Sequence, residues 1–385
     1  MCGFALFLSV SVAIANIFLA LIALGLLCNF KLTKNHLISA VKNLPAEIIF
    51  PVIFFIGTIF LSVLFSGHFL YCLKIFLDVI IWRMVPLLAV FVCIKNKRQI
   101  LILTDLIFIS IFFNNLTCIC QGLTNFNLPE WRFGGFLFVM QHASILAAAV
   151  PVATLFFMSV KNAIWKFGWL IFLAISVAAL IFNGTRGAWL ATFVTEFFIM
   201  VIYFRRQKTK MLLSICCMFL VIFGIFFSST KLNDRLESVV SFENKSNYGR
   251  ILIWKGAVNM FKDYPFTGVG LGRFGEEYRE NYILPEAVKR GYVGHAHNNF
   301  INILAECGIF GAMAYISMIG YFIYFSVKNW FRFHAETFLI LFSVVAGIFL
   351  HGLTEYTFGA TVTEKIYWLA SALCLQWLRI KNLNR

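Results

Sequence analysis

The chain has 385 residues, of which 61% are hydrophobic and only 13% are charged. Soluble domains have about 45–50% apolar and about 25% charged residues, so this composition excludes an ordinary soluble protein. The apolar runs are continuous and do not alternate with polar residues, which excludes an outer-membrane β-barrel and predicts an all-α polytopic membrane protein. The net charge of +15 would suggest nucleic-acid binding in a soluble chain. In a membrane protein, basic residues collect in cytoplasmic loops, so we expect no nucleic-acid partner.

Apolar runs of transmembrane length recur along the whole chain and are interrupted by one long polar segment. The first run has no charged leader and no convincing cleavage site, so we interpret it as a retained helix and not as a signal peptide. It is long enough for one span, or for two short spans with a turn at Asn16. The sequence therefore predicts eleven or twelve transmembrane helices, with twelve favoured. The runs cover about 4–29, 47–66, 69–93, 100–120, 136–158, 164–183, 187–204, 211–228, 299–325, 335–353 and 365–379.

The connections between the runs alternate in charge. The connections 121–135 and 354–364 carry little excess positive charge. By the positive-inside rule, the basic connections are cytoplasmic, and the turn 183–187, the long segment 229–296 and the loop 354–364 lie on the opposite, extracytoplasmic face. The basic residues that define the cytoplasmic side are Lys31, Lys34, Lys42, Lys95, Lys97, Arg98, Lys161, Lys166, Arg205, Arg206, Lys208, Lys210, Lys328, Arg332, Arg379, Lys381 and Arg385.

The long polar segment is the one part of the chain with a soluble-like composition. Apolar residues recur at helical spacing from Ile251 to Phe261, which predicts an amphipathic helix over 250–262. A glycine-rich turn then precedes a second short helix expected near 274–283. We expect one membrane domain overall, with transmembrane helices over 1–228 and 299–385 and a periplasmic loop over 229–298.

Two histidines stand directly before an apolar helix in the stretch GHAHNNFINILAECGIFG, residues 294–311. They are His295 and His297, and Asn298 is a plausible N-cap for that helix. A helix N-terminus favours the neutral imidazole that a general base requires. The alternatives are a pair that anchors a helix end at the membrane interface, or a weak metal site. The metal site is less favoured, because no cysteine or carboxylate lies nearby at ligand spacing.

Arg186, in the stretch NGTRGAWLA, lies between two apolar runs on the same face as the histidines. An arginine at the membrane surface is costly unless it is paired, so it suggests an anion such as phosphate, which guanidinium binds through two hydrogen bonds. A snorkelling interfacial arginine is the alternative. Arg250 and Arg273 are weaker candidates, because they belong to a loop with many balanced charges. There is no P-loop, so ATP hydrolysis is not predicted.

Several charged or polar residues fall within the apolar runs. Asp78 follows Lys74 at the i,i+4 spacing of a helix, which predicts a structural ion pair. Glu306 lies about 180° around its helix from His297, so we do not expect it to orient that histidine. His142 is expected to be a satisfied polar residue of the core.

Three stretches together resemble the O-antigen ligase family, which belongs to a wider group with the O-antigen polymerases and bacterial O-oligosaccharyltransferases. The stretches are GTRGAWLA, YGRILIWKGAVNMFKDYPFTGVGLGRF and HAHNNFINILAECGIFG. They lie within about residues 180–325, and the hydropathy pattern agrees over most of the chain.

The resemblance implies transfer of a glycan from undecaprenyl-diphosphate-linked O-antigen to lipid A–core oligosaccharide, at the periplasmic face of the bacterial inner membrane. It implies an inverting reaction that needs no ATP, metal or other cofactor. By the same resemblance, His297 is the base, and Arg186 and Arg250 neutralise the leaving diphosphate. Arg273 is a looser match. With His295 and Asn298, which adjoin the base, it is expected to contact substrate.

Three other functions are open to a chain of this kind. An O-antigen polymerase uses the same donor, but the compact RGAWLA and HAHNN stretches favour the ligase. Protein O-oligosaccharyltransferases are typically longer, with an extra C-terminal soluble part. A transporter of lipid-linked glycans is expected to show repeated halves and broken helices, and the sequence shows no repeat.

Overall fold

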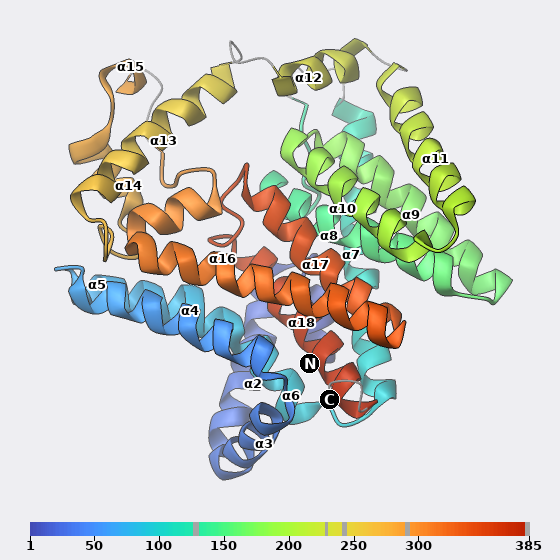
Figure 1. Ribbon diagram of the computed structural model, residues 1–385, viewed down its shortest axis with the longest axis horizontal. Helices are drawn as coiled ribbons and strands as arrows, with labels where there is room; N and C mark the ends of the chain where they lie inside the picture. Colours follow the sequence, from blue (N-terminus) through green and yellow to red (C-terminus); the bar gives the residue numbers. More distant parts are fainter. Residues whose placement is uncertain (126–130, 228–229, 241–244, 289–292, 382–385) are drawn as a thin grey trace.

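A computed structural model describes residues 1–385 except 126–130, 228–229, 241–244, 289–292 and 382–385. Every element in the described residues is helical, which confirms the all-α prediction (Figure 1). The first half comprises α1 (Cys2–Phe7), α2 (Val12–Cys28), α3 (Phe30–Asn43), α4 (Ala46–Phe65), α5 (Phe69–Phe76), the π-helix η1 (Leu77–Trp82), α6 (Arg83–Cys93), α7 (Lys97–Asn125), α8 (Val139–Ser159), α9 (Ala163–Asn183), α10 (Arg186–Phe204) and α11 (Lys208–Phe227). The second half comprises α12 (Thr230–Val240), α13 (Lys245–Asp263), α14 (Phe274–Glu277), the π-helix η2 (Tyr278–Tyr282), α15 (Pro285–Val288), α16 (Asn299–Phe333), α17 (Glu336–Gly352) and α18 (Thr361–Ile380).

The number of helices that can cross a membrane is smaller than the sequence predicted. Among the described residues, seven helices are long and apolar enough, or up to eight if the bent pair α2 and α3 is one span. One reason lies in the first apolar run, because its first part, α1, has six residues and is too short to span. Another is α17, which is apolar but has only 17 residues. The spans predicted over 211–228 and 365–379, which correspond to α11 and α18, are also not among the seven.

The start of the chain differs from the prediction in two further ways. Asn16 lies inside α2 and marks no turn, because the break falls before Ser11, whose side chain accepts a hydrogen bond from the backbone N–H of Ile14. The connection predicted over 31–46 is largely the helix α3, which is bent by 96° from α2. Its basic residues therefore lie on a helix and not in an extended loop.

Small residues let the central helices approach closely. Helix α17 packs against α8, α10, α16 and α18, and α16 also packs against α4. A side chain at Gly347 of α17 would overlap the backbone of Ala147 in α8, and Ala147 itself is fully buried. Close backbone contacts of this kind drive helix association in membranes, where burial of apolar surface contributes little.

The long polar segment lies along the upper edge of the molecule in Figure 1, above α16. The helix predicted over 250–262 is present as α13, and the one near 274–283 as α14 with η2. The turn between them docks into a break in α16 at Gly308, where the backbone has φ +66° and ψ −168°. Ile309 N–H donates to the carbonyl of Pro265 at 2.9 Å, and Val269 N–H donates to the carbonyl of Ala305 at 2.9 Å. These bonds fix the polar segment on the helix that carries the histidine motif.

We expect Gly308→Ala to lower the stability of the protein by about 1–3 kcal/mol or more, because this backbone conformation is essentially restricted to glycine. A Cβ at this position would also overlap the backbone of Phe266. Thermal unfolding of the purified protein in detergent measures the effect. Gly320→Ala in the same helix is the control, because a Cβ there meets no atom within 4 Å. Equal unfolding temperatures for the two variants would contradict the role of the break.

The charged residues within the membrane helices pair differently from the prediction. The carboxylate of Asp78 lies 3.3 Å from Arg83, which also contacts the buried carboxylate of Glu364 at 2.5 Å. In the described part of the chain no ion pair joins Asp78 to Lys74, so the predicted i,i+4 pair is wrong. Arg83 pairs with Asp78 in place of Lys74. Because Arg83 is nearly fully buried, its charge is stabilised by both carboxylates. His142 is buried and bonded to Asn115 at 2.8 Å, as expected for a core residue.

Candidate active site

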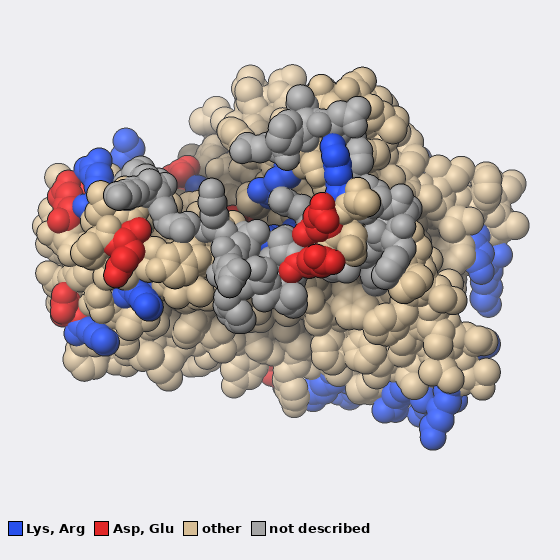
Figure 2. Space-filling model, turned by 90° about the horizontal axis from the view of Figure 1, so that it is seen from above, with Lys and Arg blue, Asp and Glu red and all other residues tan. Residues whose placement is uncertain are grey.

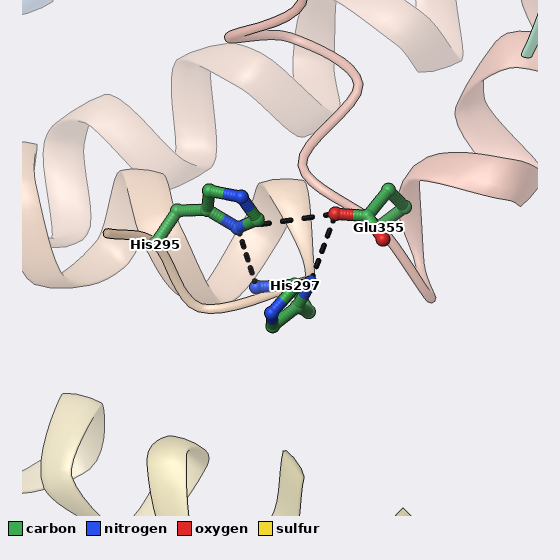
Figure 3. Close-up of side chains that lie close together, drawn as sticks. All are labelled: His295, His297 and Glu355. Carbon is green, nitrogen blue, oxygen red and sulfur yellow. Dashed lines mark hydrogen bonds and ion pairs between the residues drawn. The ribbon is translucent and has the colours of Figure 1, made fainter. Parts of the chain in front are cut away.

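The histidine motif lies where the start of α16 meets the loop that follows α17 (Figure 3). Asn298 is the predicted N-cap of α16, because its side-chain oxygen accepts from the backbone N–H of Ile301 at 3.0 Å. Its side-chain nitrogen donates to the carbonyl of Leu353 at 2.8 Å. Asn299 adds a second connection, since it accepts from the backbone N–H of Phe358 at 3.0 Å. The two asparagines therefore hold the 353–358 loop against the histidines.

This loop places Glu355 beside His297. Nδ1 of His297 lies 2.9 Å from a carboxylate oxygen of Glu355, and that oxygen also accepts from the backbone N–H of Tyr356 at 3.1 Å. Burial alone would raise the pKa of Glu355. The hydrogen bond from His297 and the electrostatic influence of both imidazoles lower this pKa to about 2. An ionised carboxylate only accepts hydrogen bonds, so Nδ1 of His297 is the donor, and in the neutral imidazole Nε2 keeps the lone pair.

His297 also has an unusual backbone. Its φ is +50°, and among the described non-glycine residues only His297 and His334 have a positive φ. Such a conformation is costly for a residue with a Cβ, and it persists only where the surroundings enforce it. Here the N-cap hydrogen bond of Asn298 and the hydrogen bond to Glu355 hold the backbone of His297 in this conformation.

His295 supports His297 from within the motif. Its Nδ1 accepts from the backbone N–H of His297 at 3.2 Å and lies 3.9 Å from Glu355. Burial and the charge of His297 lower the pKa of His295 to about 4, although Glu355 acts in the opposite direction. His295 is therefore neutral at pH 7, and its Nε2 carries the ring proton.

Two of the predicted arginines lie next to this pair. Arg250, on α13, has a terminal nitrogen 4.0 Å from the second carboxylate oxygen of Glu355. Burial lowers the pKa of Arg250, and the negative charge of Glu355 offsets part of this decrease. The guanidinium of Arg250 remains a cation at neutral pH. Arg186 is the first residue of α10 and donates to the side-chain oxygen of Asn247 at 3.1 Å. Because Asn247 and Arg250 are three residues apart on α13, that helix brings both arginines to one side of the site.

Arg132 joins the same group, although the sequence analysis did not select it. It donates to the hydroxyl of Thr185, the residue before Arg186, at 2.9 Å. Figure 2, which looks down on this face, shows Lys and Arg side chains inside a hollow with Asp and Glu side chains close by. Arg250, which lies 4.0 Å from Glu355, gives the histidine–carboxylate pair a cationic neighbour suited to an anionic substrate.

Arg273 lies elsewhere. Its two terminal nitrogens contact Glu276 at 3.1 Å and Glu277 at 2.6 Å, and the side chain is buried. Within the described ranges, no hydrogen bond or ion pair joins it to either histidine or to Glu355. Glu306, in turn, accepts from the backbone N–H of Phe274 at 3.2 Å and does not contact His297.

The structure removes one argument against a metal ion. The ligand atoms of His295, His297 and Glu355 lie within 4.8 Å of one another, and two histidines with one carboxylate form a possible metal group. No carboxylate lies near the histidines in the sequence, but in the structure Glu355, 58 residues after His297, contacts it. Against a cation stands Arg250, whose positive charge lies 4.0 Å from Glu355.

We expect EDTA to leave the activity of the purified protein unchanged, because Nδ1 of His297 donates its proton to Glu355 and does not offer a lone pair to a metal. The measurement is the initial rate of the catalysed reaction with and without chelator. Loss of activity that a divalent cation restores would replace the hydrogen-bonded pair by a metal centre.

Sequence reasoning missed Glu355 and Arg132, and only weak signals pointed to them. Both lie in connections assigned to the same face as the histidines, which restricts the candidates to a few residues. Their contacts to His297 and Thr185 depend on the packing of separate helices, which no local motif encodes.

Comparison with known proteins gives two matches. Residues 169–316 match the model of a protein family described as O-antigen ligase. An uncharacterized protein of Haemophilus influenzae is 23% identical over 249 residues. That alignment covers 60% of this chain and 61% of the relative. The family match includes Arg186, Arg250 and both histidines of the motif.

Proposed function

We propose that this chain, whose residues 169–316 match the O-antigen ligase family, transfers a glycan from undecaprenyl diphosphate to a sugar hydroxyl of lipid A–core oligosaccharide. The observation that carries the proposal is the pair formed by His297 and the buried carboxylate of Glu355, with Arg250 at 4.0 Å from that carboxylate. The reaction would take place at the periplasmic face, because the positive-inside pattern favours the side of the membrane opposite to the basic connections for the motif.

The proposed base is Nε2 of His297. It takes the proton of the acceptor hydroxyl while the hydroxyl oxygen attacks the anomeric carbon of the donor. The bond between that carbon and the diphosphate oxygen breaks, and attack from the opposite side inverts the configuration. Glu355 stabilises the imidazolium that forms, which is the role of a carboxylate behind a catalytic histidine.

Arg186 and Arg250 are proposed to bind the diphosphate as negative charge develops on it. Both are held by neutral or acidic partners, Asn247 and Glu355, which orient them before substrate binds. Fixed cations of this kind stabilise a developing anion strongly in a site with little water, by about 3–4 kcal/mol for one good donor. The diphosphate ester is already activated, so the reaction needs no ATP.

The broken helix α16 does not favour a transporter. Transporter helices are broken around a substrate cavity near the middle of the membrane. In α16 the break at Gly308 is filled by the backbone of residues 265–269, through direct hydrogen bonds. The polar groups that the break exposes are therefore satisfied within the protein.

We expect Arg186→Lys to lower the rate of transfer by about tenfold or more, because an ammonium cannot reproduce two parallel hydrogen bonds to phosphate. The rate is measured with purified donor and acceptor. Arg279→Lys is the matched control, since Arg279 lies on η2 with 58% of its side chain exposed. Equal rates for both variants would reduce Arg186 to an interfacial anchor.

The lipopolysaccharide profile of a strain that lacks this gene tests the function. Loss of the ladder of capped chains, with lipid-linked polymer of normal length accumulating, supports ligation. Single-repeat caps that persist while long chains vanish would identify a polymerase. An unchanged profile in a strain without a second homologous gene would contradict both functions.

A further inference from the structure

An apolar cavity of about 380 Å³ lies between α7, α8, α17 and α18. Its walls are mostly aliphatic and aromatic, and include Ile107, Ala149, Val344 and Leu373. Cavities of about 300–1,000 Å³ are typical of sites for small organic ligands. Two of the four helices, α7 and α8, are long and apolar enough to cross a membrane, so the ligands nearest to this cavity are those of the bilayer.

The charged end of the cavity is remote from the histidines. It begins at Glu336, the first residue of α17, whereas Glu355 follows the last residue of that helix. At 1.5 Å per residue the two ends of α17 are about 24 Å apart. Figure 1 shows α17 and α18 in the middle of the molecule, where they pack together. The cavity therefore opens at the end of the membrane domain opposite to the proposed active site.

The long axis of the cavity follows α18. Ile366 and Lys381 both line it, and these residues are separated by about 22 Å of helix. The hydrocarbon core of a bilayer is about 30 Å thick, so a cavity of this length accommodates an extended acyl chain.

Charged residues gather at one end of this cavity. Glu336 and Lys381 both line it, and within the described residues neither takes part in an ion pair. The ammonium of Lys381 lies 5.0 Å from the ring centre of Trp377, and lysine and tryptophan are typical of the membrane–water boundary. A carboxylate and an ammonium at the same mouth complement a headgroup that carries both a phosphate and an amine.

We propose that this cavity binds a zwitterionic phospholipid, with one acyl chain between the four helices, its phosphate at Lys381 and its amine at Glu336. An anionic lipid without an amine would place no positive group opposite Glu336. Phosphatidylethanolamine has the required headgroup, and phosphatidylglycerol is the matched lipid that lacks the amine.

The test uses the purified full chain in nanodiscs that contain one of these two lipids with a photoreactive group on its acyl chain. Labelled residues are identified by mass spectrometry. We expect labelling of the cavity walls, about threefold stronger with phosphatidylethanolamine than with phosphatidylglycerol, which is the range of one exposed ion pair. Glu336→Gln should bring the two lipids to equal labelling.

Filling the cavity tests the acyl-chain site separately. Ala370 lines the cavity on α18. Ala370→Phe should reduce labelling of the cavity walls by about tenfold, because the added ring occupies the space of several methylene groups of the acyl chain. Ala13→Phe, on the exposed surface of α2, is the control. Thr104→Phe fills the same cavity from α7 if the first variant does not fold. Equal labelling in filled and control variants would overturn the site, and equal labelling by both lipids in the unmodified chain would overturn the headgroup assignment.

Discussion

Replacing His297 with alanine should lower glycan transfer by about 10²–10⁴-fold, the range for loss of a general base. Nδ1 of this imidazole is hydrogen-bonded to Glu355, so its other nitrogen, Nε2, is available to accept a proton. His297→Asn is the sharper variant, because asparagine tolerates a positive φ and can still donate to the carboxylate. It should fold as the unmodified protein does and be equally inactive.

The control for this prediction is His334→Ala. His334 has the same φ of +50° at the other end of α16, so the control reproduces the loss of a histidine from a left-handed backbone. Transfer rates and unfolding temperatures are measured for all variants. Full activity of His297→Ala, or an equal loss in His334→Ala, would exclude His297 as the base.

Local sequence was sufficient to predict one part of the site. A helix cap is encoded within a few residues, so Asn298 was identifiable as the cap of α16, and the structure confirms it. Arg186 was identifiable for a related reason, since a charged residue between two apolar runs marks a helix start at the membrane surface. For Arg273 a local signal was present but was not used, because the acidic residues that bind it, Glu276 and Glu277, follow it by three and four residues.

Long-range packing determined the rest. Glu355 and His297 are 58 residues apart, and their contact depends on α17 returning beside the start of α16. The membrane helices were recognised as apolar runs, but hydropathy did not show that the first run breaks before Ser11. It also did not show that the chain around Lys31 and Lys34 forms the bent helix α3. Both features depend on how the neighbouring helices pack.

Replacing Glu355 with glutamine should lower transfer by about two to three orders of magnitude with little change in the affinity for the acceptor. An amide has the size of the carboxylate but carries no charge, so it no longer stabilises the imidazolium and can hold the wrong tautomer. The kcat and KM for acceptor are measured across pH.

Stability at different pH values separates this role from simple packing. Folding lowers the pKa of Glu355 from 4.5 to about 2, so its ionised form contributes stability that is present above pH 4.5 and is lost as the pH falls toward 2. The difference in unfolding temperature between the unmodified protein and Glu355→Gln should therefore shrink over that interval. Glu355→Asp, which keeps the charge, should recover part of the activity, and the exposed substitution Glu280→Gln should change neither property. If Glu355→Gln transferred glycan at the unmodified rate, the carboxylate would have only a structural role, and His297 would act without a partner.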